Sequence, residues 1–279
     1  MLYVCATPIG NLGDVTLRVL DTLRVVGLIA AEDTRRTRKL LARHDIHTPL
    51  TSLFEHNEAR KTAYVLGLLR DGKDVALVTD AGTPGVSDPG SRLVAAALRE
   101  GLPLTVLPGP SAVVAAVAAS GLANDEGFCF VGYLPRRAAE LRAAAGSWSA
   151  AGGLVVAFET PRRLARSLSE LAAVAPDVTG AVCRELTKLH EEVALGTLAE
   201  LAQRFAGGTR GEITLVLDFG PRASRVRGAV GAMTGEASAV AASLVATGLS
   251  PRDAATALAV CLGLSRNEAH RLVEESRPR

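Results

Sequence analysis

Short apolar runs alternate along the chain with segments whose leucines and valines recur at helical spacing. In the first half, the apolar runs are Leu2–Thr7, Gly27–Ala31, Leu50–Leu53, Val75–Val78 and Leu102–Leu107. Such short runs are typical of buried strands. Between the first two runs, Leu17, Leu20 and Leu23 recur on one helical face and predict an amphipathic helix. Strands that alternate with helices in this way predict a parallel sheet.

Loops rich in glycine and proline follow three of these predicted strands. They begin at Pro8, Asp80 and Pro108, and the longest runs from Asp80 to Gly90. One interpretation of that loop is a tight turn in which Asp88 caps the next helix. The other is a ligand site, because ligands bind at the carboxyl ends of strands in open α/β sheets. In a parallel sheet all three loops lie at the same edge, which favours the ligand site.

The pattern restarts around Gly121–Gly127, which predicts a second α/β domain with a mixed sheet. Its expected strands are Phe128–Tyr133, Leu154–Phe158, Ala181–Glu185, Glu192–Leu195 and Ile213–Phe219, with helices near 137–150, 162–175 and 197–206. We therefore divide the chain into an N-terminal domain at 1–121, a second domain at 122–220, a basic linker at 221–233 and a helical module at 234–279.

The helical module carries clear start signals. Ser250-Pro-Arg-Asp253 places proline at a first helical position beside a capping pair, and Ser265-Arg-Asn-Glu268 starts the next helix. This spacing fits a helix-turn-helix in which Arg266, Asn267, His270 and Arg271 read nucleic acid. A small dimerisation or packing module fits equally well.

Composition describes a folded protein with a sizeable core, because 48% of its 279 residues are hydrophobic. The sequence contains neither a membrane-spanning run nor a charged leader, so we expect a cytoplasmic protein.

Its four cysteines lie far apart without CxxC spacing, so we expect free thiols and no metal. The net charge of +2 is small, yet arginines cluster at 35–43, 136–142, 162–166 and 222–227, where solvated helix faces would explain most of them.

The loops lack the motifs of common nucleotide sites. No G-x-G-x-x-G follows the first strand, and no G-x-x-x-x-G-K-[ST] is present. Rigid, mostly uncharged loops with a few carboxylates nearby instead suit a polar cofactor that carries an amino-acid group and a positive centre. S-adenosylmethionine fits that description.

Long motifs in order along the chain resemble the ribosomal RNA small subunit methyltransferase I family of the tetrapyrrole methylase superfamily. The motifs are Ala6-Thr-Pro-Ile-Gly-Asn-Leu-Gly-Asp14, Ala31-Glu-Asp-Thr-Arg35, Glu55-His-Asn-Glu58, Asp80-Ala-Gly-Thr-Pro84, Ser87-Asp-Pro-Gly90, Pro108-Gly-Pro-Ser-Ala112 and Arg184-Glu-Leu-Thr-Lys-Leu-His-Glu-Glu192. The resemblance implies two α/β domains with S-adenosylmethionine in the cleft between them, usually in a homodimer. It also implies 2′-O-methylation of the ribose of cytidine 1402 in 16S rRNA, with the choice between free rRNA and the assembled 30S subunit left open.

Residue by residue, the resemblance assigns the cofactor site to the three loops. The implied residues are Pro8, Ile9, Thr83, Val86, Ser111 and Ala112, flanked by Asp80 and Gly82.

The group that takes the proton from the ribose hydroxyl stays open at this point. The candidates in the polar loops are Glu55, His56, Glu58, Glu159 and Glu185, with Lys188 able to hold phosphate or polarise the hydroxyl. For each one separately, a helix cap or salt bridge is the commoner role. Two other functions remain: a methyltransferase acting on a precorrin or uroporphyrinogen, and a non-catalytic RNA-binding assembly factor.

Overall fold

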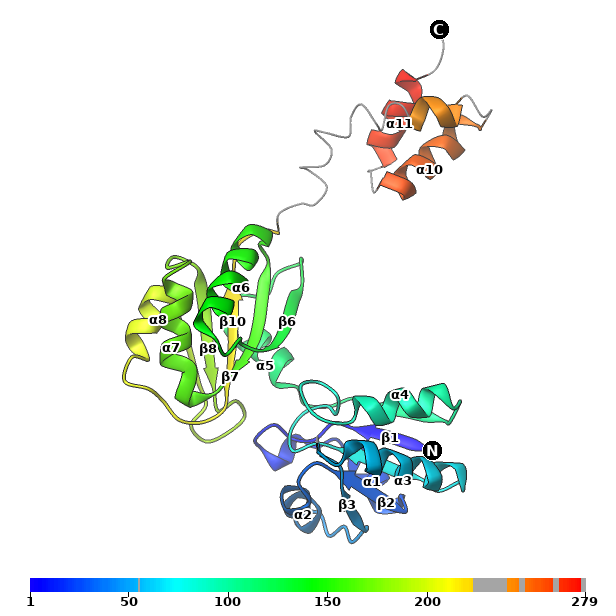
Figure 1. The fold of residues 1–279 in the computed structure, drawn as a ribbon, viewed down its shortest axis with the longest axis vertical. Coiled ribbons are helices and arrows are strands. Elements are labelled where there is room, and N and C mark those ends of the chain that lie inside the picture. The colour runs from blue at the N-terminus through cyan, green and yellow to red at the C-terminus, as the bar shows by residue number, and fades with distance from the viewer. Residues whose placement is uncertain (55, 223–239, 246–248, 263–265, 277–279) are drawn as a thin grey trace. The chain divides into compact units, whose positions relative to one another are not determined.

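The structure is a computed structural model that describes residues 1–54, 56–222, 240–245, 249–262 and 266–276. The chain divides into two compact units, Met1–Arg222 and Ala223–Arg279. The first unit contains two five-stranded sheets with helices packed on them (Figure 1). This is the expected α/β fold: two sheets with packed helices, followed by C-terminal helices.

The first sheet is parallel throughout, as the strand and helix order predicts, with strand order β3-β2-β4-β1-β5. Its strands are β1 (Leu2–Cys5), β2 (Leu28–Ala31), β3 (Leu50–Ser52), β4 (Val75–Val78) and β5 (Leu104–Leu107). Its helices are α1 (Leu17–Val25), α2 (Thr34–Arg43), α3 (Glu58–Arg70) and α4 (Ser91–Arg99), and a short 3-10 turn, η1 (Leu12–Asp14), precedes α1.

Helices cover both faces of this sheet. Leu23 of α1 and Leu40 of α2 pack with Ala76 of β4 on one face. Val65 of α3 and Leu93 of α4 pack with the adjacent residue, Leu77, on the other. Successive strand residues point to opposite faces, so a strand buried on both sides is apolar at every position.

The second sheet is mixed, as predicted, with strand order β6-β7-β10-β8-β9. Its strands are β6 (Phe128–Tyr133), β7 (Leu154–Glu159), β8 (Thr179–Arg184), β9 (Glu192–Thr197) and β10 (Ile213–Asp218). Only β6 and β7 pair in parallel; the other three pairings are antiparallel. The helices α6 (Ala138–Ala151), α7 (Pro161–Ala172) and α8 (Leu198–Arg204) pack on one face of this sheet.

Helix α5 (Ala112–Ser120) connects the two sheets. It follows β5 of the first sheet, but its residues Val113, Ala116 and Val117 pack against Val156 and Val216 of the second. The side-chain oxygen of Ser111 accepts a hydrogen bond from the Val114 N–H and caps the helix. The third Gly/Pro loop therefore lies where the two sheets meet.

The second unit contains a helical segment at 240–245 followed by α10 (Pro251–Leu262) and α11 (Arg266–Glu275). Ala241, Leu258 and Val273 form its small core. Pro251 opens α10 as predicted, and Ser250 Oγ accepts from the Asp253 N–H at 3.2 Å. Most of the linker predicted at 221–233, together with Ser265, lies outside the described residues. Among the helices that the structure does describe, none has the length and apolar character needed to span a membrane.

Gly90 provides a test of this packing, because it precedes α4 with φ of +121° and a Cβ there would lie 2.8 Å from Leu77 Cδ2. We predict that Gly90→Ala lowers the free energy of unfolding by about 2 kcal/mol or more, measured by urea denaturation. The control Gly72→Ala also places alanine at positive φ, but there a Cβ would meet nothing within 4 Å. Its cost should be about 1 kcal/mol. Equal losses in the two variants would show that the contact with Leu77 has no effect.

Candidate functional site

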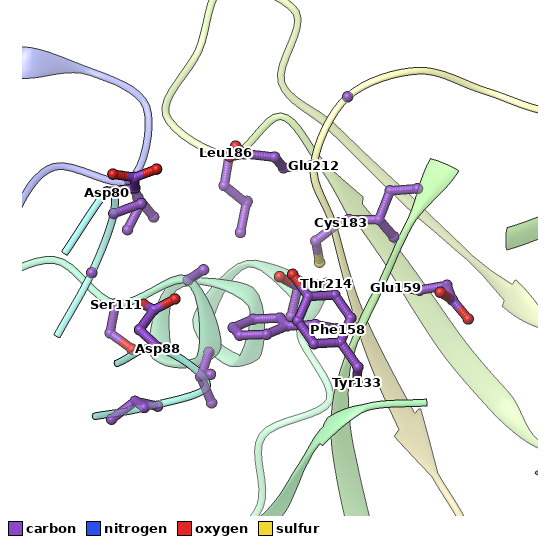
Figure 2. Close-up of a pocket in the computed structure, with 18 of the residues that line it drawn as sticks. Asp80, Asp88, Ser111, Tyr133, Phe158, Glu159, Cys183, Leu186, Glu212 and Thr214 are labelled. Atoms are coloured by element: carbon purple, nitrogen blue, oxygen red, sulfur yellow. The ribbon is translucent and has the colours of Figure 1, made fainter. Parts of the chain in front are cut away.

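A cavity of about 360 Å³ lies at the carboxyl edge of the first sheet, between its loops and the second sheet (Figure 2). The loops after β1 and β4 are joined there by a pair of backbone hydrogen bonds. Thr7 N donates to Gly82 O at 2.8 Å, and Gly82 N donates to Thr7 O at 3.0 Å. The loops therefore form a fixed wall, as expected from β1, β4 and β5 being neighbours in a parallel sheet.

This wall contains seven of the eight residues that the resemblance assigns to the cofactor. They are Ile9, Asp80, Gly82, Thr83, Val86, Ser111 and Ala112. Pro8 precedes Ile9 in the first loop but does not line the cavity. The loops predicted from three separate parts of the sequence thus converge on one space.

Three carboxylates, Glu32, Asp80 and Asp88, and the guanidinium of Arg36 are among the charged groups of the wall. Asp80 is held firmly, since its Oδ1 accepts from the Asp33 N–H at 3.0 Å and its Oδ2 lies 3.3 Å from Arg36 Nε. The Asp80 N–H in turn donates to Glu32 Oε2 at 3.2 Å. In the part of the chain that the structure describes, no group of acidic, His or Cys side chains is placed to hold a metal ion.

Burial in this cluster changes how two of the carboxyl groups titrate. Burial, with the charges of Glu32 and Asp80, raises the pKa of Asp88 to about 7. Burial also raises the pKa of Glu32, although its hydrogen bond from the Asp80 N–H opposes the change. Both effects follow from placing several like charges in partly desolvated surroundings. The cavity therefore favours a cationic ligand and holds a carboxyl group that titrates near neutral pH.

The opposite wall comes from the second sheet and is largely apolar. The rings of Tyr133 and Phe158 meet edge to face with centroids 5.6 Å apart, and Leu186, Cys183 and Thr214 also belong to this wall. Burial raises the pKa of the Cys183 thiol to about 11, so it remains protonated and is a poor nucleophile. This wall can contact the planar or apolar part of a ligand.

Glu159 also borders the cavity, but its carboxylate points away from the other labelled side chains (Figure 2). The side chain is fully buried, and it accepts from Arg163 Nη2 at 2.8 Å and from Ser167 Oγ at 2.6 Å. The Thr160 N–H donates to its other oxygen at 2.6 Å. These contacts occupy both oxygens and fit a structural role.

The remaining candidates for catalysis do not line the cavity. Glu58 Oε1 accepts from the N–H groups of Gly90 and Arg92 and caps α4. Glu185 Oε1 accepts from Lys188 Nζ and from the Glu212 N–H, both at 2.8 Å. Lys188 also bonds Glu212, which does line the cavity. Glu185 and Lys188 therefore contact a residue of the wall without lining the cavity themselves. Glu55 lies outside the described residues.

Several residues that line the cavity are not among the predicted site residues: Glu32, Arg36, Asp88, Tyr133 and Phe158 are examples. Two of these residues could have been predicted from their position in the sequence. Glu32 directly follows β2 and is therefore at the same sheet edge as the loops, and Asp88 is inside the central loop. Tyr133 and Phe158 come from the second sheet, and no sequence pattern indicates which part of that sheet faces the loops.

Comparisons with known proteins agree on one family. The sequence profile described as Tetrapyrrole (Corrin/Porphyrin) Methylases matches residues 1–202. A protein of Micromonospora olivasterospora named Ribosomal RNA small subunit methyltransferase I is 46% identical over 80% of this chain and 71% of its own length. A protein of the same name from Thermotoga maritima is 44% identical over 77% of this chain and 97% of its own.

Solved structures resemble the chain at the level of the fold. A cobalt precorrin-4 methyltransferase superposes with a TM-score of 0.59 and 19% identity, covering 79% of this chain and 96% of its own. A uroporphyrin-III C-methyltransferase from Thermus thermophilus, solved in complex with S-adenosyl homocysteine, gives a TM-score of 0.57 and 19% identity, with coverage of 78% and 96%.

The buried position of Glu159 predicts a loss of stability in Glu159→Ala. Removing the carboxylate leaves Ser167 without a hydrogen-bond partner and Arg163 without its counter-charge, while Arg163 Nη2 keeps its bond to Leu134 O at 2.6 Å, so the free energy of unfolding should fall by about 2 kcal/mol. The control Glu140→Ala removes an exposed carboxylate paired with Arg137, and should cost less than about 0.5 kcal/mol. Urea denaturation measures both. Unchanged stability in Glu159→Ala would contradict the structural role.

Asp88 predicts a pH dependence of stability. Its folded pKa of about 7 lies above the ordinary 3.8, so the folded state keeps a proton that the unfolded state has already released. Stability should therefore fall as pH rises from about 4 to about 7, and then level off. Asp88→Asn should reduce that fall, seen by comparing urea denaturation at several pH values. Identical pH profiles for the two proteins would show that Asp88 titrates normally.

Proposed function

Because the chain belongs to the tetrapyrrole methylase superfamily, and within it to the ribosomal RNA small subunit methyltransferase I family, we propose that it methylates 16S rRNA with S-adenosylmethionine. The proposed target is the ribose 2′-hydroxyl of cytidine 1402, within the 30S subunit. The observation that carries the proposal is the cavity at the carboxyl edge of the first sheet, where the loops at Pro8, Asp80 and Pro108 converge.

The residues around this cavity fit the proposed cofactor. A volume of about 360 Å³ falls within the usual range for a site that holds a small ligand. Asp80 and its carboxylate neighbours would attract the ammonium and sulfonium charges. The first turn of α5, at Ala112 and Val113, presents backbone N–H groups that suit the ligand's carboxylate. Tyr133 and Phe158 offer an apolar surface for its adenine ring.

When bound, S-adenosylmethionine supplies a methyl group activated by the adjacent sulfonium. The protein must then align a ribose hydroxyl and accept its proton, and alignment is a large part of such catalysis. We infer that Asp88 accepts the proton. It lines the cavity with the loop residues assigned to the cofactor, and a positioned carboxylate can serve as a general base. In contrast, both oxygens of Glu159 are already occupied, and Glu185 and Lys188 pair with each other and do not line the cavity.

The proposal extends to the surroundings of the enzyme. A 30S substrate places the reaction in the cytoplasm, where these subunits are assembled. A homodimer is supported by apolar side chains exposed on neighbouring elements: Leu17 at the start of α1 is 79% exposed, Val106 of the edge strand β5 is 50% exposed and Val114 of α5 is 58% exposed. Apolar residues on an edge strand favour a covering partner.

Methyl transfer from labelled S-adenosylmethionine to 30S subunits that lack the modification tests the proposal. We expect incorporation at the ribose of cytidine 1402 when the methylated nucleotide is mapped. Labelling of a uroporphyrinogen or precorrin instead of 30S subunits would move the substrate to a tetrapyrrole. Absence of cofactor binding in calorimetry would leave only a non-catalytic role.

Asp80→Asn tests the assignment of Asp80 to the cofactor site. Loss of the charge should weaken S-adenosylmethionine binding about tenfold or more, measured by calorimetry. The matched control is Asp71→Asn, which removes an exposed carboxylate after α3 at the opposite edge of the same sheet and should leave binding unchanged. Equal affinity in the two variants would remove Asp80 from the proposed site.

A further inference from the structure

Helix α2 presents an unusually cationic surface. Of its ten residues, those exposed to solvent are Arg35, Arg36, Arg38, Lys39, Ala42 and Arg43, and the helix contains no acidic residue. Its inward side chains, Thr37, Leu40 and Leu41, are buried against the first sheet. The outer side of α2 is therefore positively charged along its length, and we call it the α2 basic face.

Two of these cations have a partner and three do not. Arg35 pairs with Asp33 at 2.7 Å, and Arg36 pairs with Asp80 at 3.3 Å. Arg38, Lys39 and Arg43 make no ion pair within the described part of the chain. Their charges are therefore available to an external anion.

The α2 basic face begins at the cavity. Arg36 lines the cavity, and Glu32, one residue beyond β2, lines it too. From there the helix runs back along the first sheet for about 15 Å, the length of ten residues. A polyanion bound along this face would have one end at the cavity mouth.

This arrangement works against the stability of the helix itself. Arg35 and Lys39, and Lys39 and Arg43, are like charges four residues apart, a spacing that destabilises helices. Arg35 and Arg36 also lie at the positive end of the helix dipole, where the N-cap Asp33 and the carboxylate of Asp80 oppose their charges. The like-charge spacing does not stabilise the helix, and it fits a surface that binds a polyanion.

We propose that Arg38, Lys39 and Arg43 bind the phosphodiester backbone of the RNA next to the target nucleotide, and that Arg36 marks the point where the strand reaches the cavity. The inference rests on the proposed function for its choice of RNA as the polyanion. Phosphate contacts of this kind fix the register of a strand without reading its sequence.

The test compares two triple variants of the full chain. Arg38→Gln, Lys39→Gln and Arg43→Gln together neutralise the α2 basic face. The control combines Arg24→Gln, Lys73→Gln and Arg99→Gln, three exposed cations at the opposite edge of the same sheet. Both variants lose the same charge, so a difference between them reports the position of the charges.

We expect the α2 variant to bind unmodified 30S subunits at least tenfold more weakly than the control variant in filter binding. The dependence of log affinity on log salt should be less steep for the α2 variant than for the control variant. The difference in slope should be about 2, as for three lost phosphate contacts. The S-adenosylmethionine affinity of the α2 variant should stay unchanged, and its melting temperature should stay equal or rise. A purely structural role of these cations would instead lower the melting temperature.

The outcomes separate this inference from the proposed function. Equal 30S affinity in the two variants, with methyl transfer intact in the wild type, overturns the α2 assignment alone. Weaker binding by the α2 variant, in a protein that transfers no methyl group to 30S subunits, supports the assignment and overturns the proposed reaction. Absence of both selective binding and transfer overturns both.

Discussion

The apolar contact between the first loop and the second sheet holds the site together. Ile9 of that loop packs in one cluster with Leu186, Val113 and Val216, so the first loop, α5 and the second sheet share a single core. The backbone approaches closely here: a Cβ at Gly10 would lie 2.7 Å from Lys188 Cγ, and the Asn11 N–H donates to Thr187 Oγ1 at 3.0 Å. Both walls of the cavity therefore depend on this contact.

Electrostatics divide the same region into an acidic interior and a basic exterior. Glu32, Asp80 and Asp88 concentrate negative charge in the cavity, while α2 carries positive charge on the outside. Arg36 joins the two through its contact with Asp80. A cationic cofactor and an anionic strand are thus attracted to adjacent but different places, which is the separation that methyl transfer to RNA requires.

Much of this fold follows from the period of apolar residues, and the loops at the sheet edge follow from the parallel strand order. Two features do not. Helix α5 reads AVVAAVAAS and is apolar on every side, so its sequence cannot indicate that it packs on the second sheet. Glu159 is next to Phe158 in β7, and alternation sends adjacent side chains to opposite faces, so the two residues border the cavity in different orientations. Which face meets the loops is decided by contacts distant in sequence.

The loop after β8 has a strained backbone that positions Leu186 in the site. Glu185 and Thr187 adopt φ values of +53° and +67°, which cost energy for residues other than glycine. Between them, Leu186 reaches both the cavity and the core that joins the sheets. The hydrogen bonds from Lys188 and Glu212 to Glu185 hold this conformation. The motif that contains Glu185 and Lys188 is thus explained by a strained turn that fixes Leu186, and a chemical role for either residue is not needed to account for it.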